Sequence, residues 1–326
     1  MTDLSTTFAG LNLKNPIIAA SSGLTRNLRK IKEIAEAGVG AIVLKSLFEE
    51  QIEGQGALLL GNTDYPEAYD YISTYVKNDE VGKYLEFVKQ VKATVKVPVI
   101  ASINCYKLDT WVDFASQIAK SGVDALEINV MKLETDLFFD PIAEEQGYID
   151  IVQKLKSTVH IPIIMKLSKN HTALVSMIDK LAAAGLNGVT LFNRSYQTDI
   201  DINKLEMTSG NVFTTAHDIS DTLRYTGIVS GMVPELPVAS STGVHSWEEV
   251  VKCLLAGAAC VQMCSTIYAN GPKAIRDGLD GLKIWMEKKG YRSIDEFKGK
   301  LNAANIPSQT VYERMQFMKY FSSKEV

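Results

Sequence analysis

The sequence predicts an α/β fold in which eight parallel strands, each followed by a helix, close into a (β/α)8 barrel of the TIM type. Two short patterns support this prediction, and they alternate along the chain four times. One is a proline followed by an apolar run, and the other is a glycine that follows a helix-like stretch and precedes an apolar run. Each glycine comes 20 to 24 residues after its proline, which fits repeated strand–helix units.

The proline pattern predicts where four of the strands begin. Proline has no backbone N–H, so it is tolerated best at the first residue of a strand. The residues after it are apolar without alternation, as in parallel strands that are buried on both faces. The four segments are Asn15-Pro16-Ile17-Ile18, Val97-Pro98-Val99-Ile100, Ile161-Pro162-Ile163-Ile164 and Leu236-Pro237-Val238-Ala239.

The glycine pattern predicts the ends of four helices and the strands that follow them. Glycine adopts the left-handed conformation at a helix C-terminus without steric cost, and Gly38, Gly122, Gly185 and Gly257 hold this position. Helical spacing precedes these glycines, with apolar residues on one face. Examples are Leu28, Ile31, Ile34 and Ala35, and Leu174, Met177, Ile178 and Leu181. Ser246 and Glu249 form a predicted capping box at the start of another helix.

An open, doubly wound sheet is the alternative architecture. That fold carries a G-x-G-x-x-G turn after its first strand, whereas Ser21-Ser22-Gly23-Leu24-Thr25 has a single glycine, so the barrel is favoured. We expect residues 1–326 to form one barrel domain. Long segments at about 47–80, 131–144 and 194–216 are expected to be insertions on its C-terminal face, where such barrels build their sites. Four tyrosines of the first insertion form either a lid or surface packing: Tyr65, Tyr69, Tyr71 and Tyr75.

Composition excludes several classes of protein. Of 326 residues, 46% are hydrophobic and 22% charged, and the net charge of -4 gives no basic surface for nucleic acid. No apolar window of membrane-spanning length and no signal peptide is found, so no membrane association is expected. Four cysteines without a C-x-x-C pair favour a reduced, cytoplasmic compartment, and scattered histidines give no metal site.

The predicted strand ends are polar, and in a barrel they converge on one cavity. Polar groups inside apolar strands cost free energy unless they are satisfied, so these ends predict a ligand site. The ends are Ser21-Ser22-Gly23, Lys45-Ser46, Ser102-Ile103-Asn104, Glu127-Ile128-Asn129, Lys166-Leu167-Ser168, Asn193-Arg194, Ser240-Ser241-Thr242-Gly243 and Gln262-Met263-Cys264-Ser265-Thr266.

Two features of these ends indicate the ligand. The loops Ser241-Thr242-Gly243 and Cys264-Ser265-Thr266 follow strands seven and eight, where such barrels bind phosphate through backbone N–H groups. Lys45 and Lys166 end strands two and five inside the cavity. A lysine there either stabilises the anionic reduced form of a flavin or forms a Schiff base, as in barrel aldolases, and the residues alone leave both roles open.

Several short motifs, in order and spacing, resemble the soluble class of dihydroorotate dehydrogenases, which are FMN enzymes on a (β/α)8 barrel. The resemblance covers nearly the whole chain. The motifs are Ala20-Ser21-Ser22-Gly23, Val43-Leu44-Lys45-Ser46, Glu127-Ile128-Asn129, Met165-Lys166-Leu167, Ser241-Thr242-Gly243-Val244, Val261-Gln262-Met263 and Gly290-Tyr291-Arg292-Ser293-Ile294.

The resemblance implies a flavin site, a small-molecule substrate and a homodimer. The family's reaction, dihydroorotate to orotate in pyrimidine biosynthesis, transfers a hydride to the flavin while a base takes the neighbouring proton. The residues implied for FMN are Ser21, Ser22, Gly23, Lys45, Ser46, Asn129, Lys166, Ser241, Thr242, Gly243, Cys264, Ser265 and Thr266. Those implied for substrate are Lys45, Asn129 and Asn193. Arg194 is a further substrate candidate, and the catalytic candidates are Lys132 and Lys45.

The chain departs from the family pattern mainly in the substrate half. The family's Asn-x-Ser-Cys-Pro-Asn run, whose cysteine is the base, is here Asn129-Val130-Met131-Lys132-Leu133-Glu134. Lys132 is therefore either a replacement base or a solvated loop lysine. The family's Asn-Ser-Met-Gly loop aligns near 72–75, which lack its asparagine amide. The family's strand-seven Gly-Thr-Gly-Gly is here 240–243, Ser-Ser-Thr-Gly. Arg194, a serine in the family, pairs with a substrate carboxylate or forms a surface salt bridge.

The favoured reading is an FMN oxidoreductase acting on a CH–CH bond, with dihydroorotate or a related planar amide or carboxylate as substrate. A Schiff-base lyase using Lys166 or Lys45 is one alternative. A flavin-binding paralogue that has lost catalysis is the other.

Overall fold

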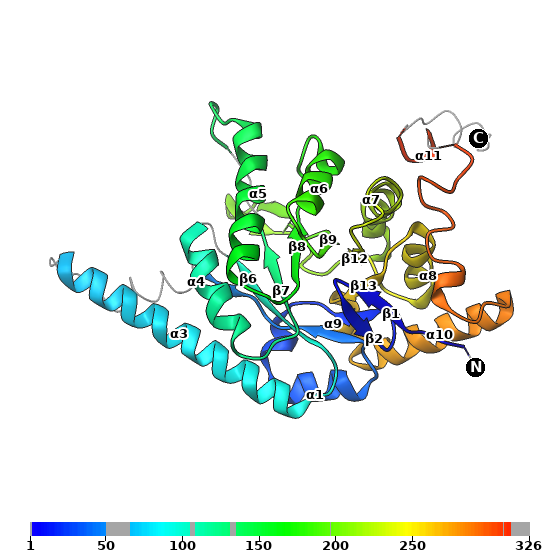
Figure 1. Cartoon of the computed structure of the whole chain (residues 1–326), viewed down its shortest axis with the longest axis horizontal. Coiled ribbons are helices and arrows are strands. Elements are labelled where there is room, and N and C mark those ends of the chain that lie inside the picture. The colour runs from blue at the N-terminus through cyan, green and yellow to red at the C-terminus, as the bar shows by residue number, and fades with distance from the viewer. Residues whose placement is uncertain are drawn as a thin grey trace.

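The computed structural model describes residues 2–49, 66–104, 108–130, 135–195, 197–308 and 310–313. Its centre is a parallel barrel in which pairing between β4 and β6 closes the sheet order β4-β3-β13-β12-β9-β8-β7-β6 (Figure 1). The strands are β3 (Ile17–Ala19), β4 (Ala41–Val43), β6 (Val99–Asn104), β7 (Ala125–Asn129), β8 (Ile163–Leu167), β9 (Gly188–Leu191), β12 (Val238–Ser241) and β13 (Cys260–Met263). The predicted (β/α)8 barrel is confirmed, and a closed sheet excludes the doubly wound alternative.

A helix follows each barrel strand and packs on its outer face. The eight are α1 (Leu28–Glu36), α3 (Pro66–Thr94), α4 (Leu108–Ala119), α5 (Pro141–Thr158), α6 (Leu174–Ala183), α7 (Ile219–Met232), α8 (Trp247–Ala256) and α10 (Lys273–Lys289). The smaller elements are β5 (Leu47–Phe48), which extends the pairing with β6, α9 (Ser265–Asn270), α11 (Thr310–Glu313), η1 (Gly23–Arg26), η2 (Ala216–Asp218) and η3 (Ile294–Glu296). The capping box of Ser246 and Glu249 is present at the start of α8.

The proline and glycine patterns act as predicted, and they share one hydrogen-bonding scheme. The carbonyl oxygen of each strand-initiating proline accepts a bond from a backbone N–H of the neighbouring glycine-led strand, at 2.8 to 3.0 Å. The donor–acceptor pairs are Val261 to Pro16, Ile42 to Pro98, Leu126 to Pro162 and Val189 to Pro237. The four glycines have φ between +87° and +109°, so each lies in the left-handed region that favours glycine.

A short hairpin that the sequence patterns did not predict closes the amino end of the barrel. Strands β1 (Thr6–Phe8) and β2 (Leu11–Leu13) pair antiparallel and lie across the barrel mouth (Figure 1). Phe8 is fully buried against inward-facing strand residues such as Ile18 and Ile164. A Cβ added at Gly188 would lie 3.0 Å from the Phe8 ring, so the glycine makes room for this plug.

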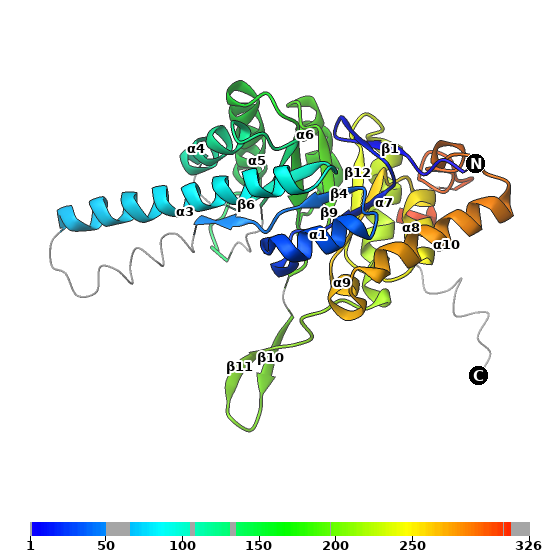
Figure 2. The same ribbon diagram turned by 90° about the horizontal axis from the view of Figure 1, so that it is seen from below.

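The insertions differ in extent from their prediction. Residues 47–80 were expected to precede a helix, but α3 already begins at Pro66, where proline is favoured in a first helical turn. The first part of α3 extends beyond the barrel (Figures 1 and 2), and residues 72–75 lie within it. Tyr65 lies outside the described residues, and so do the side chains of Tyr69, Tyr71 and Tyr75, so the lid stays a prediction.

The third insertion contains a β-hairpin. Strands β10 (Thr198–Asp201) and β11 (Glu206–Ser209) pair antiparallel and project away from the barrel (Figure 2). In the second insertion, Asp140 caps α5 by accepting a hydrogen bond from the backbone N–H of Ile142, while 131–134 lie outside the described residues. The long segments therefore build distinct elements instead of one continuous cover.

We expect Phe8→Ala to lower the free energy of unfolding by about 3–5 kcal/mol, because it empties a fully buried aromatic site. Phe138→Ala is the matched control, since Phe138 is 94% exposed and its loss should change stability by less than about 0.5 kcal/mol. Urea denaturation followed by circular dichroism measures both variants. Equal midpoints for the two would contradict the plug.

Candidate active site

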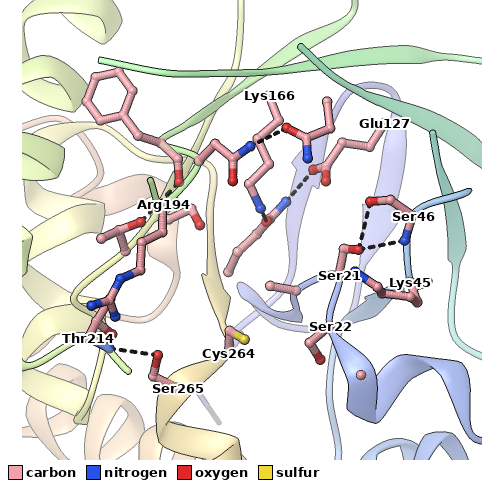
Figure 3. A pocket seen from close by; sticks show the side chains of 18 of the residues that line it. Ser21, Ser22, Lys45, Ser46, Glu127, Lys166, Arg194, Thr214, Cys264 and Ser265 are labelled. Carbon is pink, nitrogen blue, oxygen red and sulfur yellow. Dashed lines mark hydrogen bonds between the residues drawn. The ribbon is translucent and has the colours of Figure 1, made fainter. Parts of the chain in front are cut away.

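A cavity of about 450 Å³ opens at the carboxyl ends of the barrel strands (Figure 3). Its volume lies in the range of small-molecule and cofactor sites. The structure brings together these predicted residues in its lining: Ser21, Ser22, Gly23, Lys45, Ser46, Asn129, Lys166, Asn193, Arg194, Ser241, Thr242, Gly243, Cys264 and Ser265. Thr266 does not line it, because its side chain is buried and its hydroxyl donates to the carbonyl of His245 at 3.2 Å. Lys132 and Cys105 lie outside the described residues.

Sequence reasoning missed several residues of the cavity wall. Asn104, Glu127 and Gln262 belong to polar strand ends, which was a usable signal, but no role was assigned to them. The aromatic residues had no such signal, because they reach the cavity from β5, from the end of β9, from the segment after the hairpin and from α9. They are Phe48, Phe192, Phe213 and Tyr268. The site is therefore a polar floor with partly aromatic walls.

Four side chains from β7, β8, β9 and β13 share one buried hydrogen-bond network in the floor. Glu127, from β7, is fully buried and accepts from the Gln262 amide at 2.7 Å and from the Thr190 hydroxyl at 3.1 Å. The Gln262 carbonyl oxygen in turn accepts from the Lys166 ammonium at 3.1 Å. Because Glu127 takes the amide N–H of Gln262, the amide oxygen must face Lys166, and the lysine is held in place.

Glu127 also retains an unused acceptor. Its Oε1 atom is buried and has no hydrogen-bond partner within the described part of the chain. Buried carboxylate oxygens are normally hydrogen-bonded, and Glu127 lines the cavity. A ligand that donates a hydrogen bond fits this position.

A second network fixes the strand tips on the opposite side of the cavity. The Ser21 hydroxyl accepts from the backbone N–H of Ser46 at 3.0 Å, and the Ser46 and Ser102 hydroxyls are 2.8 Å apart. The Tyr84 hydroxyl, from α3, accepts from the backbone N–H of Ser102 at 3.1 Å. Burial raises the pKa of the Tyr84 phenol, so it stays neutral here. These bonds hold the wall beside Lys45 rigid.

Lys45 and Cys264 are electrostatically perturbed. Burial, aided by the charge of Arg26, lowers the pKa of the Lys45 ammonium, which lies 4.5 Å from the centre of the Phe48 ring. Burial raises the pKa of the Cys264 thiol, although the nearby Lys166 and Lys45 partly oppose it. Cys264 is therefore a protonated thiol near neutral pH.

The two loops predicted to bind phosphate meet at one end of this cavity. Thr242 and Gly243 have φ of +84° and +82°, and a Cβ added at Gly243 would lie 2.3 Å from the backbone nitrogen of Ile219. Only glycine lets this loop pack against the start of α7. Ser265 begins α9, and its hydroxyl accepts from the backbone N–H of Thr214 at 3.0 Å. The loops thus present backbone and hydroxyl groups, which suit an anion.

The geometry fits a flavin nucleotide at three points. The floor carries a fixed cation and an unpaired acceptor, the side wall carries Lys45, and one end carries the two loops. Asn129 and Asn193 lie side by side in the cavity wall, with the Asn193 amide donating to the Asn129 carbonyl oxygen. These amides provide polar groups for a planar ring. The roles assigned to each residue stay predictions.

Comparisons with known proteins agree with this geometry. The family model described as dihydroorotate dehydrogenase matches residues 3–286. A protein of Aeropyrum pernix, whose name includes dihydroorotate dehydrogenase A (fumarate), is 29% identical, and the match covers 91% of this chain and 97% of that relative. Dihydroorotate dehydrogenase B (NAD(+)) catalytic subunits of Thermoplasma volcanium and Caldicellulosiruptor saccharolyticus are 25% and 27% identical; each match covers 92% of this chain, and 98% and 99% of the two relatives.

Two further features concern the described residues alone. No helix among them is long and apolar enough to cross a membrane. Nor does any group of three or more histidine, cysteine, aspartate or glutamate side chains in these ranges have the arrangement of a metal site.

We expect Gln262→Met to lower the free energy of unfolding by about 1–3 kcal/mol, because it removes a hydrogen-bond partner from both Glu127 and Lys166 inside the barrel. Gln90→Met is the control, since Gln90 is exposed on α3 and bonds only weakly to Glu86 at 3.3 Å. Thermal and urea unfolding measure both. A Gln262 variant as stable as the control would show that the network contributes little.

Proposed function

The chain belongs to the dihydroorotate dehydrogenase family, and on that premise we propose that it is an FMN-dependent oxidoreductase that converts dihydroorotate to orotate. The observation that carries the proposal is the convergence of Lys45, Lys166 and the loops after β12 and β13 on one cavity. The relatives' names share dihydroorotate oxidation and differ in the electron acceptor, so the shared half-reaction is carried over.

The floor and side wall are proposed to hold the flavin ring. Lys166 and Lys45 place positive charge in the cavity, and a cation beside the ring stabilises the negative charge of the reduced cofactor. Gln262 and Glu127 fix the Lys166 ammonium, so this charge needs little reorganisation when the ring is reduced. The loops at 241–243 and 264–266 suit a single phosphate, which favours the mononucleotide.

The substrate is proposed to bind at the Asn129 and Asn193 amides. When bound, the flavin supplies the hydride-accepting chemistry, and the protein must supply a base for the neighbouring proton. Lys132 occupies the position of the family's catalytic cysteine and is the proposed base. An amine can accept a proton only in its neutral form, which exclusion of water by bound ligands favours.

The assembly and setting follow from the same resemblance. We propose a homodimer, as in the soluble class. Cys253, Cys260 and Cys264 are free, which suits a reducing compartment such as the cytoplasm.

We expect the purified or FMN-reconstituted protein to show visible flavin absorbance that bleaches when dihydroorotate is added without oxygen. Spectrophotometry in an anaerobic cell measures both steps. Absence of flavin absorbance would reject the cofactor, whereas stable absorbance without bleaching would keep the flavin and reject the substrate. Borohydride trapping of a carbonyl compound on Lys45 or Lys166 would instead support the lyase alternative.

We expect Lys132→Met to slow bleaching by dihydroorotate by about 10²–10⁴-fold, the range typical of losing a general base, without weakening FMN binding. Lys169→Met is the control, because Lys169 is an exposed lysine that pairs with Asp221. Stopped-flow absorbance gives the rates, and flavin fluorescence gives the affinity. An unchanged bleaching rate would identify Lys132 as a solvated loop residue.

A further inference from the structure

Arg194 is held in an arrangement that leaves part of its guanidinium unsatisfied. Its Nη2 atom donates to the carbonyl oxygen of Asn211 at 2.6 Å. Its Nη1 atom is buried and finds no hydrogen-bond partner among the described residues. A buried guanidinium N–H without an acceptor costs free energy, and Arg194 lines the cavity. This unpaired hydrogen-bond donor therefore points to an anionic ligand.

The side chain points toward one end of the cavity. In Figure 3, Arg194 extends from the tip of β9 toward Thr214 and Ser265, whereas Lys45 and Ser46 lie across the cavity. The direction matters, because Ser265 belongs to one of the two loops that suit a phosphate. To bind a substrate at the Asn129 and Asn193 amides, the guanidinium would have to point toward the proposed position of the flavin ring instead.

Neighbouring groups respond to the charge of Arg194 at this end. Burial acts to raise the pKa of the Asp218 carboxyl, but hydrogen bonds from Thr215 and the charge of Arg194 lower it overall. Burial lowers the pKa of the His245 imidazole, and Arg194 adds to this, against Glu249 and Asp218.

Asp218 and His245 have hydrogen-bond partners of their own, so the Arg194 guanidinium is available to a ligand at the loops after β12 and β13. The Oδ2 atom of Asp218 is used locally, since it accepts from the Thr215 backbone N–H at 2.6 Å and from the Thr215 hydroxyl at 3.1 Å. His245 is engaged with the Thr214 hydroxyl at 2.8 Å. Of the three cationic side chains that line the cavity within the described residues, Lys166 is held in the floor by Gln262 and Lys45 lies on the far wall.

We infer that Arg194 binds the phosphate of the flavin mononucleotide, as a charged side chain added to the backbone donors of the two loops. The inference rests on the proposed function. A guanidinium gives a phosphate charge-assisted and often bidentate hydrogen bonds, which a neutral loop does not provide. It replaces the substrate-carboxylate role that the sequence had suggested for Arg194.

Arg194 also couples this end to the projecting hairpin. The segment after β11 returns past Asn211, which accepts the guanidinium bond, and continues to Thr214, whose backbone N–H donates to Ser265. Phe213 packs against Tyr268 with ring centres 5.4 Å apart. Phosphate binding by Arg194 would thus tie the insertion to the nucleotide.

The test compares two flavins that differ only in the phosphate. Apoprotein of the wild type, Arg194→Gln, Arg194→Lys and Lys169→Gln is titrated with FMN and with riboflavin, and quenching of flavin fluorescence gives each affinity. We expect Arg194→Gln to weaken FMN by about 10- to 100-fold while riboflavin changes less than about threefold. Arg194→Lys should restore part of the loss, and Lys169→Gln, which removes an exposed charge, should change neither.

The outcomes separate this inference from the proposed function. A wild type that binds neither flavin would overturn both. Equal loss of FMN and riboflavin in Arg194→Gln would make Arg194 a structural residue, and the function would stand. Orotate binding is measured as a shift of the flavin spectrum. If Arg194→Gln leaves the FMN affinity unchanged and weakens orotate binding, Arg194 binds the substrate carboxylate and the inference is wrong. Because both flavins are titrated into one preparation, a partly misfolded variant does not alter their ratio.

Discussion

The register of the parallel strands is the constraint on which the rest of the structure depends. Pairing aligns Asn129 with Lys166 and Lys166 with Thr190 on β7, β8 and β9, and it aligns Ser241 with Gln262 on β12 and β13, so polar residues of neighbouring strands lie in register near the carboxyl ends. Side chains alternate between the two faces of a strand, so a slip of one residue would turn Lys166 outward among the helices. The proline carbonyl bonds at the other end of the strands hold this register.

The interior of the barrel is consequently divided into two layers. At the amino end, Phe8 and inward-facing apolar residues form a dry plug. At the carboxyl end, Glu127, Gln262 and Lys166 form a hydrogen-bonded polar layer. The plug stabilises by burying apolar surface, whereas the polar layer is costly unless each group has a partner. This division concentrates the fixed charges where a ligand can reach them.

The sequence predicted what local chemistry controls and missed what distant contacts control. Proline and glycine act through their own backbone geometry, so strand starts and helix ends could be read directly, and polar strand tips identified the cavity wall. Phe8 gave no signal because its partners come from strands far along the chain. Phe213 and Tyr268 were missed because their meeting depends on the path of the hairpin segment. The start of α3 was missed because long loops and helices are poorly distinguished without a periodic apolar face.

The chain departs from the family pattern mainly in loops that follow the barrel strands, where strand pairing does not fix the positions of the side chains. Asn129 and Lys166 lie at strand tips and are paired there with neighbouring strands, which fix their positions. Arg194 follows β9, beyond its last paired residue Leu191, where substitution leaves the sheet unchanged. A loop arginine can therefore extend from β9 toward Ser265 without disturbing the floor. The barrel fixes the strand-tip part of the cavity, and the loops are free to change what the rest of the cavity binds.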